Sequence, residues 1–155
     1  MRSMFFAAAL AAAVSPMSFA QSCETDPSLV GHRTANGAVR AQYTAVERGE
    51  WHNVVHIGEG LVDTGLSARN RTAAWSNLCA GYAATGDVEA AIAACDSALE
   101  LRDTAWRALN NRGVAHWLAG NQEAALADFQ AANAASSGED EVEANIAMVT
   151  CTTAS

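Results

Sequence analysis

The chain has 155 residues and a net charge of −8, from 17 acidic residues and nine basic ones, all of them arginines. A negative chain without a basic stripe is a poor candidate for binding nucleic acid or an anionic membrane surface. Alanine is abundant, and both prolines precede the repeated part of the sequence described below, so the composition favours a nearly all-helical protein of one domain.

Residues 1–20 have the pattern of a secretory signal peptide. Arg2 is followed by an apolar, alanine-rich run over residues 5–14 and then by the small-residue cleavage signature Ser18-Phe19-Ala20. The run is too short to cross a bilayer, which takes roughly 20 apolar residues. We predict cleavage after Ala20, a periplasmic or secreted location, and no membrane insertion of the remaining chain. Acylation of Cys23, as in a lipoprotein, is the alternative.

A helical hairpin is predicted after an N-terminal segment that spans residues 21–35. Residues 36–48 form its first helix, Gly49-Glu50 its turn, and residues 51–62 its second helix. The polar residues that follow are typical of a longer connecting loop. This hairpin, residues 36–71, is a degenerate copy of the two that come after it.

The clearest hairpin spans residues 72–105. Trp75, Leu78 and Tyr82 recur at positions i, i+3 and i+7, which places them on one stripe of a helix. Gly86 then relieves the chain reversal, because glycine accepts a positive φ without a Cβ clash. In the second helix, Ala91 lets the two helices approach closely.

The same pattern returns in residues 106–138, at a constant interval from the hairpin before. The matching small and apolar positions of this third hairpin are Leu109, Gly113, Gly120, Ala125, Phe129 and Ala132. Residues 139–155 then form a capping helix and tail, with Ala144, Ile146 and Ala147 expected to pack inward. A period of about 34 residues is typical of stacked helical hairpins, and such arrays need capping elements at their ends.

These hairpins resemble the tetratricopeptide repeat (TPR). Trp75, Leu78 and Tyr82 match the family's W-x2-L-G-x2-Y pattern, with Cys79 in place of the glycine. The resemblance implies an all-α, right-handed solenoid of about three antiparallel helix-turn-helix hairpins with a C-terminal capping helix. It also implies a scaffold for protein–protein interaction that is not an enzyme.

In this family, the first helices of the hairpins line a concave groove that often holds a peptide or an extended segment. The resemblance places these partner-binding residues in it: Tyr43, Ser76, Asn77, Ala80, Arg107, Asn110, Asn111, Val114 and Trp117. Asn77 and Asn111 could hydrogen-bond a partner's backbone, whereas Trp117 could instead pack beneath the capping helix. The basic clamp that some members use for C-terminal carboxylates is mostly missing, so no chaperone-tail clamp is predicted.

Four cysteines remain after the predicted cleavage, an even number that suggests disulfides in an exported protein. Cys79 and Cys95 lie at nearly the same height on the two antiparallel helices around Gly86, so a bridge between them is predicted. Cys23 and Cys151 would then join the two ends of the chain. Free buried thiols are the alternative, because cysteine also packs as a small hydrophobe.

The sequence offers no convincing catalytic or metal site. His52, His56 and Glu59 have helical spacing for a metal, but they fall on the outer face of the first hairpin and lack a third strong ligand. His116 stands in place of a packing aromatic, and no Cys-x-x-Cys motif occurs. We predict no metal, no cofactor, and a protein or peptide partner. Two other hypotheses stay open: a structural or self-associating array, forming a homo-oligomer, and a metal- or thiol-dependent enzyme.

Overall fold

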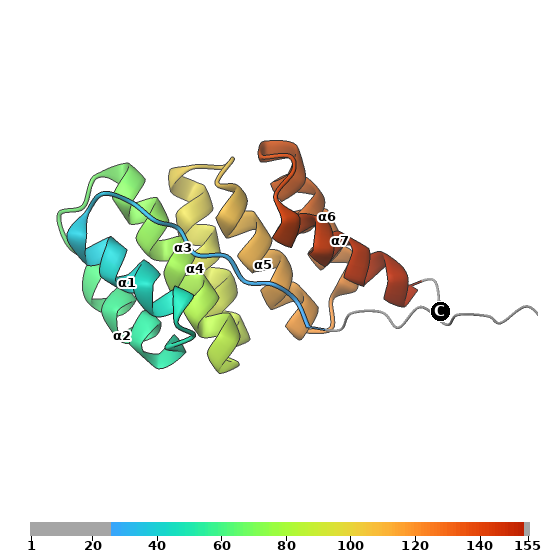
Figure 1. Cartoon of the computed structure of the whole chain (residues 1–155), viewed down its shortest axis with the longest axis horizontal. Coiled ribbons are helices and arrows are strands. Elements are labelled where there is room, and N and C mark those ends of the chain that lie inside the picture. Colours follow the sequence, from blue (N-terminus) through green and yellow to red (C-terminus); the bar gives the residue numbers. More distant parts are fainter. Residues whose placement is uncertain (1–25, 154–155) are drawn as a thin grey trace, which may run out of the picture.

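The computed structural model describes residues 26–153, and in this part of the chain seven helices follow one another. They are α1 (Gly37–Glu47), α2 (Trp51–Val62), α3 (Ala68–Thr85), α4 (Val88–Leu101), α5 (Trp106–Leu118), α6 (Gln122–Ala135) and α7 (Asp140–Thr153). The first six pair into three hairpins, each packed on the next, and α7 packs on α6 (Figure 1). The predicted all-α array of three hairpins and a capping helix is confirmed.

Glycines with positive φ close the three hairpins. Gly49, Gly86 and Gly120 have φ values of 65°, 88° and 78°, in the left-handed region where a Cβ is unfavourable. Asp87 and Asn121 then cap α4 and α6, because each side-chain oxygen accepts a hydrogen bond from the backbone N–H three residues further on. These tight turns hold the paired helices antiparallel and side by side.

Small residues let the two helices of a hairpin lie close together. Ala91 and Ala125, the predicted contact positions on the second helices, are fully buried. Gly113 faces the fully buried Phe129, and a Cβ at Gly113 would lie 2.6 Å from the ring. The absence of a side chain on one helix therefore makes room for the largest buried side chain on the other.

Helix α3 begins earlier than the sequence predicted. Residues 68–71, which were expected in a connecting loop, form its first turn. Ser67 caps this turn by accepting a hydrogen bond from the Asn70 N–H, and the Arg71 guanidinium donates to the carbonyl of Thr64. Polar residues favour helix N-termini as well as loops, which is why composition alone misplaced this boundary.

The face that α7 buries also differs from the prediction. Val142, Asn145 and Val149 are buried, at positions i, i+3 and i+7, whereas Ala144 and Ala147 are exposed. Ile146, which was also predicted to pack inward, is half-buried and does pack on the core clusters. The larger apolar side chains determine the rotation of the helix, because they remove more apolar surface from water than alanine does.

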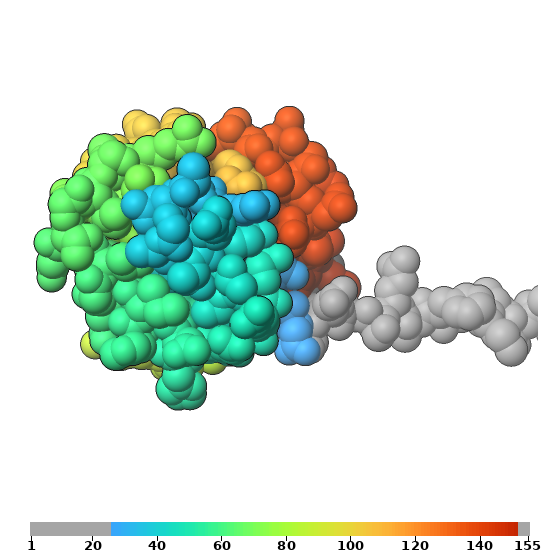
Figure 2. Space-filling model, turned by 60° about the vertical axis from the view of Figure 1, so that its left-hand side comes forward, coloured from blue at the N-terminus to red at the C-terminus, as the bar shows by residue number. Residues whose placement is uncertain are grey.

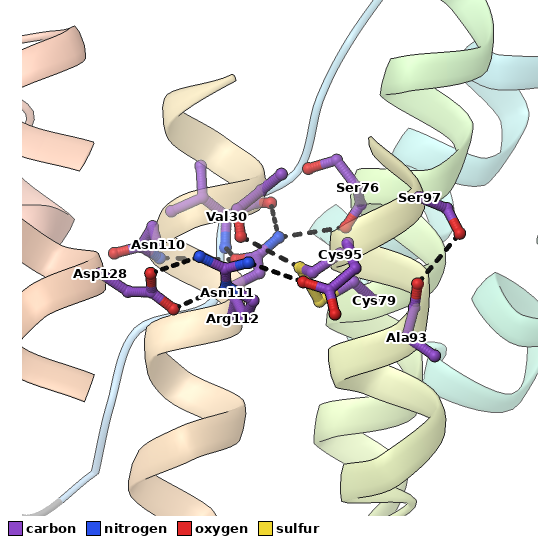
Figure 3. The surroundings of a disulfide bond; sticks show 12 residues. Val30, Ser76, Cys79, Ala93, Cys95, Ser97, Asn110, Asn111, Arg112 and Asp128 are labelled. Carbon is purple, nitrogen blue, oxygen red and sulfur yellow. Dashed lines mark hydrogen bonds and ion pairs between the residues drawn. A yellow bond between two sulfur atoms is a disulfide. The ribbon is translucent and has the colours of Figure 1, made fainter. Parts of the chain in front are cut away.

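A disulfide joins α3 to α4, as predicted. Cys79 and Cys95 are bonded, with their Cα atoms 5.2 Å apart, and both are fully buried (Figure 3). Cys151 is disulfide-bonded as well. Cys23, the partner that the sequence analysis assigns to it, lies outside the described residues, as does the predicted signal peptide, so that pairing stays a prediction.

None of the helices between residues 26 and 153 combines the length and the apolar character that a bilayer-crossing helix needs.

Candidate functional site

The groove side of the array is crossed by the chain's own N-terminal segment. Residues 27–34, in extended conformation, run past α7, α5 and α3 before the chain enters α1 (Figure 1). Figure 2 shows the molecule from the α1–α2 end, and there the blue atoms lie next to the cyan atoms of that first hairpin. We call residues 27–34 the groove segment.

Three asparagines, spaced by the repeat period, hold the backbone of the groove segment. The side-chain oxygens of Asn145, Asn111 and Asn77 accept hydrogen bonds from the N–H groups of residues 28, 30 and 32, at 2.8, 2.9 and 2.6 Å. Their Nδ2 atoms donate to the carbonyls of the same three residues, at 2.9, 2.9 and 3.0 Å. Alternate residues of an extended chain face the same side. Residues 28, 30 and 32 therefore face the array, and each of them meets a different helix: α7, α5 and α3 in turn.

Further buried amides keep these asparagines in place. Asn110 donates to the Ser28 carbonyl at 2.9 Å and accepts from Asn145, also at 2.9 Å. Asn111 makes an additional bond to the Ser76 carbonyl at 3.1 Å (Figure 3). Asn77, Asn110 and Asn111 are completely buried, so an amide without a partner there would be costly. The network therefore fixes each amide in the orientation that fits an extended backbone.

The residues between the hydrogen-bonded ones meet side chains. Leu29 packs against the apolar clusters of the array. Gly31 lies so close to α1 that a Cβ there would be 2.9 Å from the ring of Tyr43 and 3.1 Å from Val46. Tyr43 stands one repeat period before Asn77, so the first helix contacts the segment with a ring where the later helices use an amide. A larger residue at position 31 would consequently have to displace the Tyr43 ring.

The other predicted groove residues have varied surroundings. Ala80 and Val114 are buried in the array, and the Ser76 hydroxyl is buried without a hydrogen-bond partner among the described residues. Trp117 is half-buried and packs on the cluster that contains Met148 of α7. The guanidinium of Arg107 lies 4.1 Å from the ring centre of Trp106, in a cation–π contact.

A hollow of about 480 Å³ stays open beside the groove segment. Besides the segment itself, its walls include three aromatic residues and three acidic ones: Tyr43, Trp51, Trp106, Glu47, Glu139 and Glu141. Arg107 is the basic residue in this lining. A chain bound along the groove would therefore find room for side chains on this side.

The histidines and the acid on the outer face of α2 do not converge on a metal site. No group of three potential ligands occurs within residues 26–153. Glu59 instead accepts a hydrogen bond from the Tyr82 hydroxyl at 2.8 Å. Burial and this bond raise the pKa of Tyr82 to about 12. His116 lies 3.7 Å from the carboxylate of Asp128, at the edge of the hairpin core.

Sequence reasoning missed the groove segment and one of its three asparagines. Asn145 was assigned to a capping helix and not to the groove, although it lies one repeat period after Asn111. Extending the interval from Asn77 through Asn111 to the last helix would have found it. The residues of the groove segment carry no comparable signal, because the asparagines contact their backbone.

Comparison with known proteins identifies a fold but no closer family. No protein-family model matches the chain, and no curated protein matches it significantly. Solved TPR domains do share its fold. The first TPR domain of Spaghetti (RPAP3), bound to the HSP90 peptide SRMEEVD, has a TM-score of 0.65 at 15% identity, over 76% of this chain and 91% of that one.

Two further structures agree. The second TPR domain of human RPAP3, in complex with the HSP70 peptide SGPTIEEVD, has a TM-score of 0.60 at 18% identity, over 73% of this chain and 92% of that one. The Arabidopsis OM64 TPR domain has a TM-score of 0.62 at 17% identity, over 72% and 90% of the two chains. At these identities the likeness establishes a TPR-like fold, over about three quarters of the chain.

Proposed function

We propose that this protein is a scaffold whose groove binds an extended segment of a partner protein, and that it acts in the periplasm or outside the cell after loss of residues 1–20. One observation carries the proposal. Asn77, Asn111 and Asn145 each pair with both the N–H and the C=O of an extended backbone. Such bonds do not depend on the side chains of the bound segment, so the same amides suit a segment from another chain.

A partner segment has to displace the chain's own. The groove segment is attached to the array, and a tethered ligand competes at an effective concentration on the order of millimolar. A successful partner therefore binds more strongly than an unattached copy of residues 27–34 would. Side-chain contacts in the adjoining hollow, with Trp51 and Trp106 for example, are one source of that additional binding.

The shape of the groove restricts which segments fit. The place of Leu29 is lined by apolar clusters, and the place of Gly31 admits no Cβ because of Tyr43 and Val46. We infer that partner segments carry an apolar residue followed two positions later by glycine. The peptides bound by the RPAP3 domains, SRMEEVD and SGPTIEEVD, lack this order.

Peptide binding to a chain with its groove opened tests the proposal. In Gly31→Val, the new side chain collides with Tyr43, so the groove segment leaves its place. A fluorescent peptide with the sequence of residues 26–34 should then bind this variant at least tenfold more tightly than the wild-type chain, whose own segment competes.

Two controls make the result specific. The same peptide with valine at position 31 should bind neither chain, and adding Asn111→Ala to Gly31→Val should remove binding of the glycine peptide. Equal binding of both peptides, or equal binding to wild type and Gly31→Val, would contradict a groove that recognises extended segments.

A structural or self-associating array is the second candidate, and the filled groove favours it. If the groove segment is a permanent part of the fold, the opened variant should bind no peptide and should lose helicity. If segments exchange between copies, Gly31→Val should abolish a concentration-dependent increase in mass that sedimentation detects for the wild-type chain.

A further inference from the structure

Three arginines gather around His32, away from the hydrogen-bonding amides of the groove. Arg69 lies in the first turn of α3, Arg102 directly follows α4, and Arg107 lies in the first turn of α5. Burial, followed by the charges of Arg107, Arg102 and Arg69, lowers the pKa of the His32 imidazole to about 4. In a chain of net charge −8 with nine basic residues, this is a marked local excess of positive charge.

Two cavities adjoin this histidine. The larger has a volume of about 280 Å³ and the smaller about 100 Å³, and His32 and Arg102 line both. Arg69 contributes to the larger cavity, and Thr104 and Arg107 to the smaller one. No carboxylate lines either cavity within the described residues, and the polar side chains that do line them belong to His32, the three arginines, Thr72 and Thr104.

Two residues that line the smaller cavity each have a shielded side-chain nitrogen without a partner. Nδ1 of His32 and Nε of Arg107 are shielded from solvent and make no hydrogen bond within residues 26–153. A shielded polar atom without a partner costs free energy, so such atoms usually have one. The start of α5 adds free donors, because its N-cap, Ala105, has no side chain that could satisfy the first backbone N–H groups.

The three arginines are also not neutralised. The ion pairs found in the described part of the chain involve other basic residues, and Arg69, Arg102 and Arg107 take part in none of them. Glu139 and Glu141 act on Arg107 through space without a direct ion pair. The positive charge around His32 is therefore available to a ligand.

We propose that the cavities around His32 bind an oxyanion, either a sulfate- or phosphate-type group or a carboxylate, between His32, Arg102 and Arg107. Arginine forms short charge-assisted hydrogen bonds to such groups, and the N-terminus of α5 favours negative charge. The larger cavity leaves room for the rest of a molecule that carries the group. His32 is held by its backbone bonds to Asn77, so the site needs the groove segment in place and does not depend on a partner in the groove.

A titration with sulfate tests this site, with the imidazole nitrogens of His32 followed by NMR in the oxidised chain. Sulfate stays ionised through the relevant pH range. We expect saturable shifts at His32 and a rise in its pKa by about one unit or more, because a nearby anion favours the imidazolium. Acetate, titrated in parallel, distinguishes a carboxylate site from a site for tetrahedral anions. If neither anion shifts the His32 signals in a saturable way, the cavities hold water and the proposal is wrong.

Two arginine variants separate the site from general charge. Arg102→Ala should weaken the binding of the anion by about tenfold or more, the loss expected for one charge-assisted hydrogen bond. Arg40→Ala removes the same charge from an exposed position on α1 and should leave the affinity unchanged. Equal weakening by both variants would overturn the proposal. Thermal stability is not a suitable readout, since sulfate stabilises folded proteins in general.

Discussion

The first hairpin and the later helices contact the same groove segment, but they do so with different side chains. On α3, α5 and α7, an asparagine at the same place in the repeat period binds the backbone of the groove segment. On α1, that place is taken by Tyr43, whose ring contacts Gly31 and leaves no space for a side chain. The later helices therefore bind the backbone of the segment, whereas the first helix packs a ring against Gly31.

The two regions also differ in how their hairpins are held together. A disulfide links α3 to α4, whereas the α1–α2 hairpin has no covalent link. Its contact with the rest of the array depends on packing, with Gly58 and Gly81 at the seams where α2 meets its neighbours. It also depends on hydrogen bonds, such as those from Tyr82 to Glu59 and from Gln42 to the Ala74 carbonyl. The first hairpin should thus be the part of the array that opens most easily.

The largest effect is expected from removing the disulfide. In the double variant Cys79→Ala, Cys95→Ala, the free energy of unfolding should fall by about 3 kcal/mol, because the unfolded chain regains the freedom of a closed loop. Urea unfolding measures the change. In the wild-type chain, the amides of α3 and α4 should be better protected from hydrogen exchange than those of α1 and α2. The double variant should lose this difference. An unchanged difference in protection between the two hairpins would contradict the comparison.

A smaller loss is expected from removing one groove amide. Asn111→Ala leaves the N–H and C=O of Val30 and the carbonyl of Ser76 without their partner, and should cost about 2 kcal/mol. The matched control is Asn53→Ala on α2, an exposed asparagine that bonds only Glu50. Its unfolding free energy should stay within about 0.5 kcal/mol of wild type. Similar losses in both variants would argue against the groove amides as special contacts.

Two glycines should respond to alanine with opposite signs. At Gly81, a Cβ would lie 2.9 Å from Val54 and 3.0 Å from Val55, both stiff at χ1, so Gly81→Ala should cost about 1–2 kcal/mol. At Gly60, on the same helix as these valines, a Cβ meets nothing within 4 Å. Gly60→Ala should therefore stabilise by about 0.5–1 kcal/mol through helix propensity. Thermal unfolding of both variants would show whether the first hairpin packs as tightly as described.

The last expected effect concerns pH and is confined to acidic conditions. Because the pKa of His32 is about 4 in the folded chain and 6.5 without its folded surroundings, the unfolded state binds a proton first as the pH falls. The stability contributed by neutral His32 is complete above pH 6.5 and is lost as the pH falls toward 4. His32→Gln should reduce the loss in melting temperature between pH 7 and pH 4.5. His52→Gln, an exposed residue of the first hairpin, should leave that loss unchanged.

The fold was predictable where local pattern and packing agree. Between residues 72 and 138, the stripe of Trp75, Leu78 and Tyr82, the turn at Gly86 and the small residue Ala91 all favour the same hairpin, and the structure has it. The bridge from Cys79 to Cys95 followed from their similar distance to the turn. The predicted buried face of α7 was wrong for Ala144 and Ala147, because Val142 and Val149 have larger apolar side chains and are buried instead.

The occupant of the groove was not predictable in this way. Asn77 and Asn111 were expected to bind the backbone of a partner, and in the structure they bind the backbone of this chain. Every residue except proline has the same backbone N–H and C=O groups, so the sequence of a segment does not reveal that its backbone is bound. Gly31 alone carries a specific requirement, and a single glycine is common in any loop, because glycine suits many backbone conformations. The use of these residues by a partner stays a prediction.

The asparagine contacts also have a consequence for the order of folding. Residue 32 meets a helix 45 positions away in sequence, residue 30 one 81 away, and residue 28 one 117 away. Stacked hairpins can form one after another from short-range contacts, whereas contacts of such separation form slowly. The earliest of these residues to be synthesised must wait for the last helix before its binding place exists. The bonds between Ser28 and Asn145 are therefore the last of the three sets that can form.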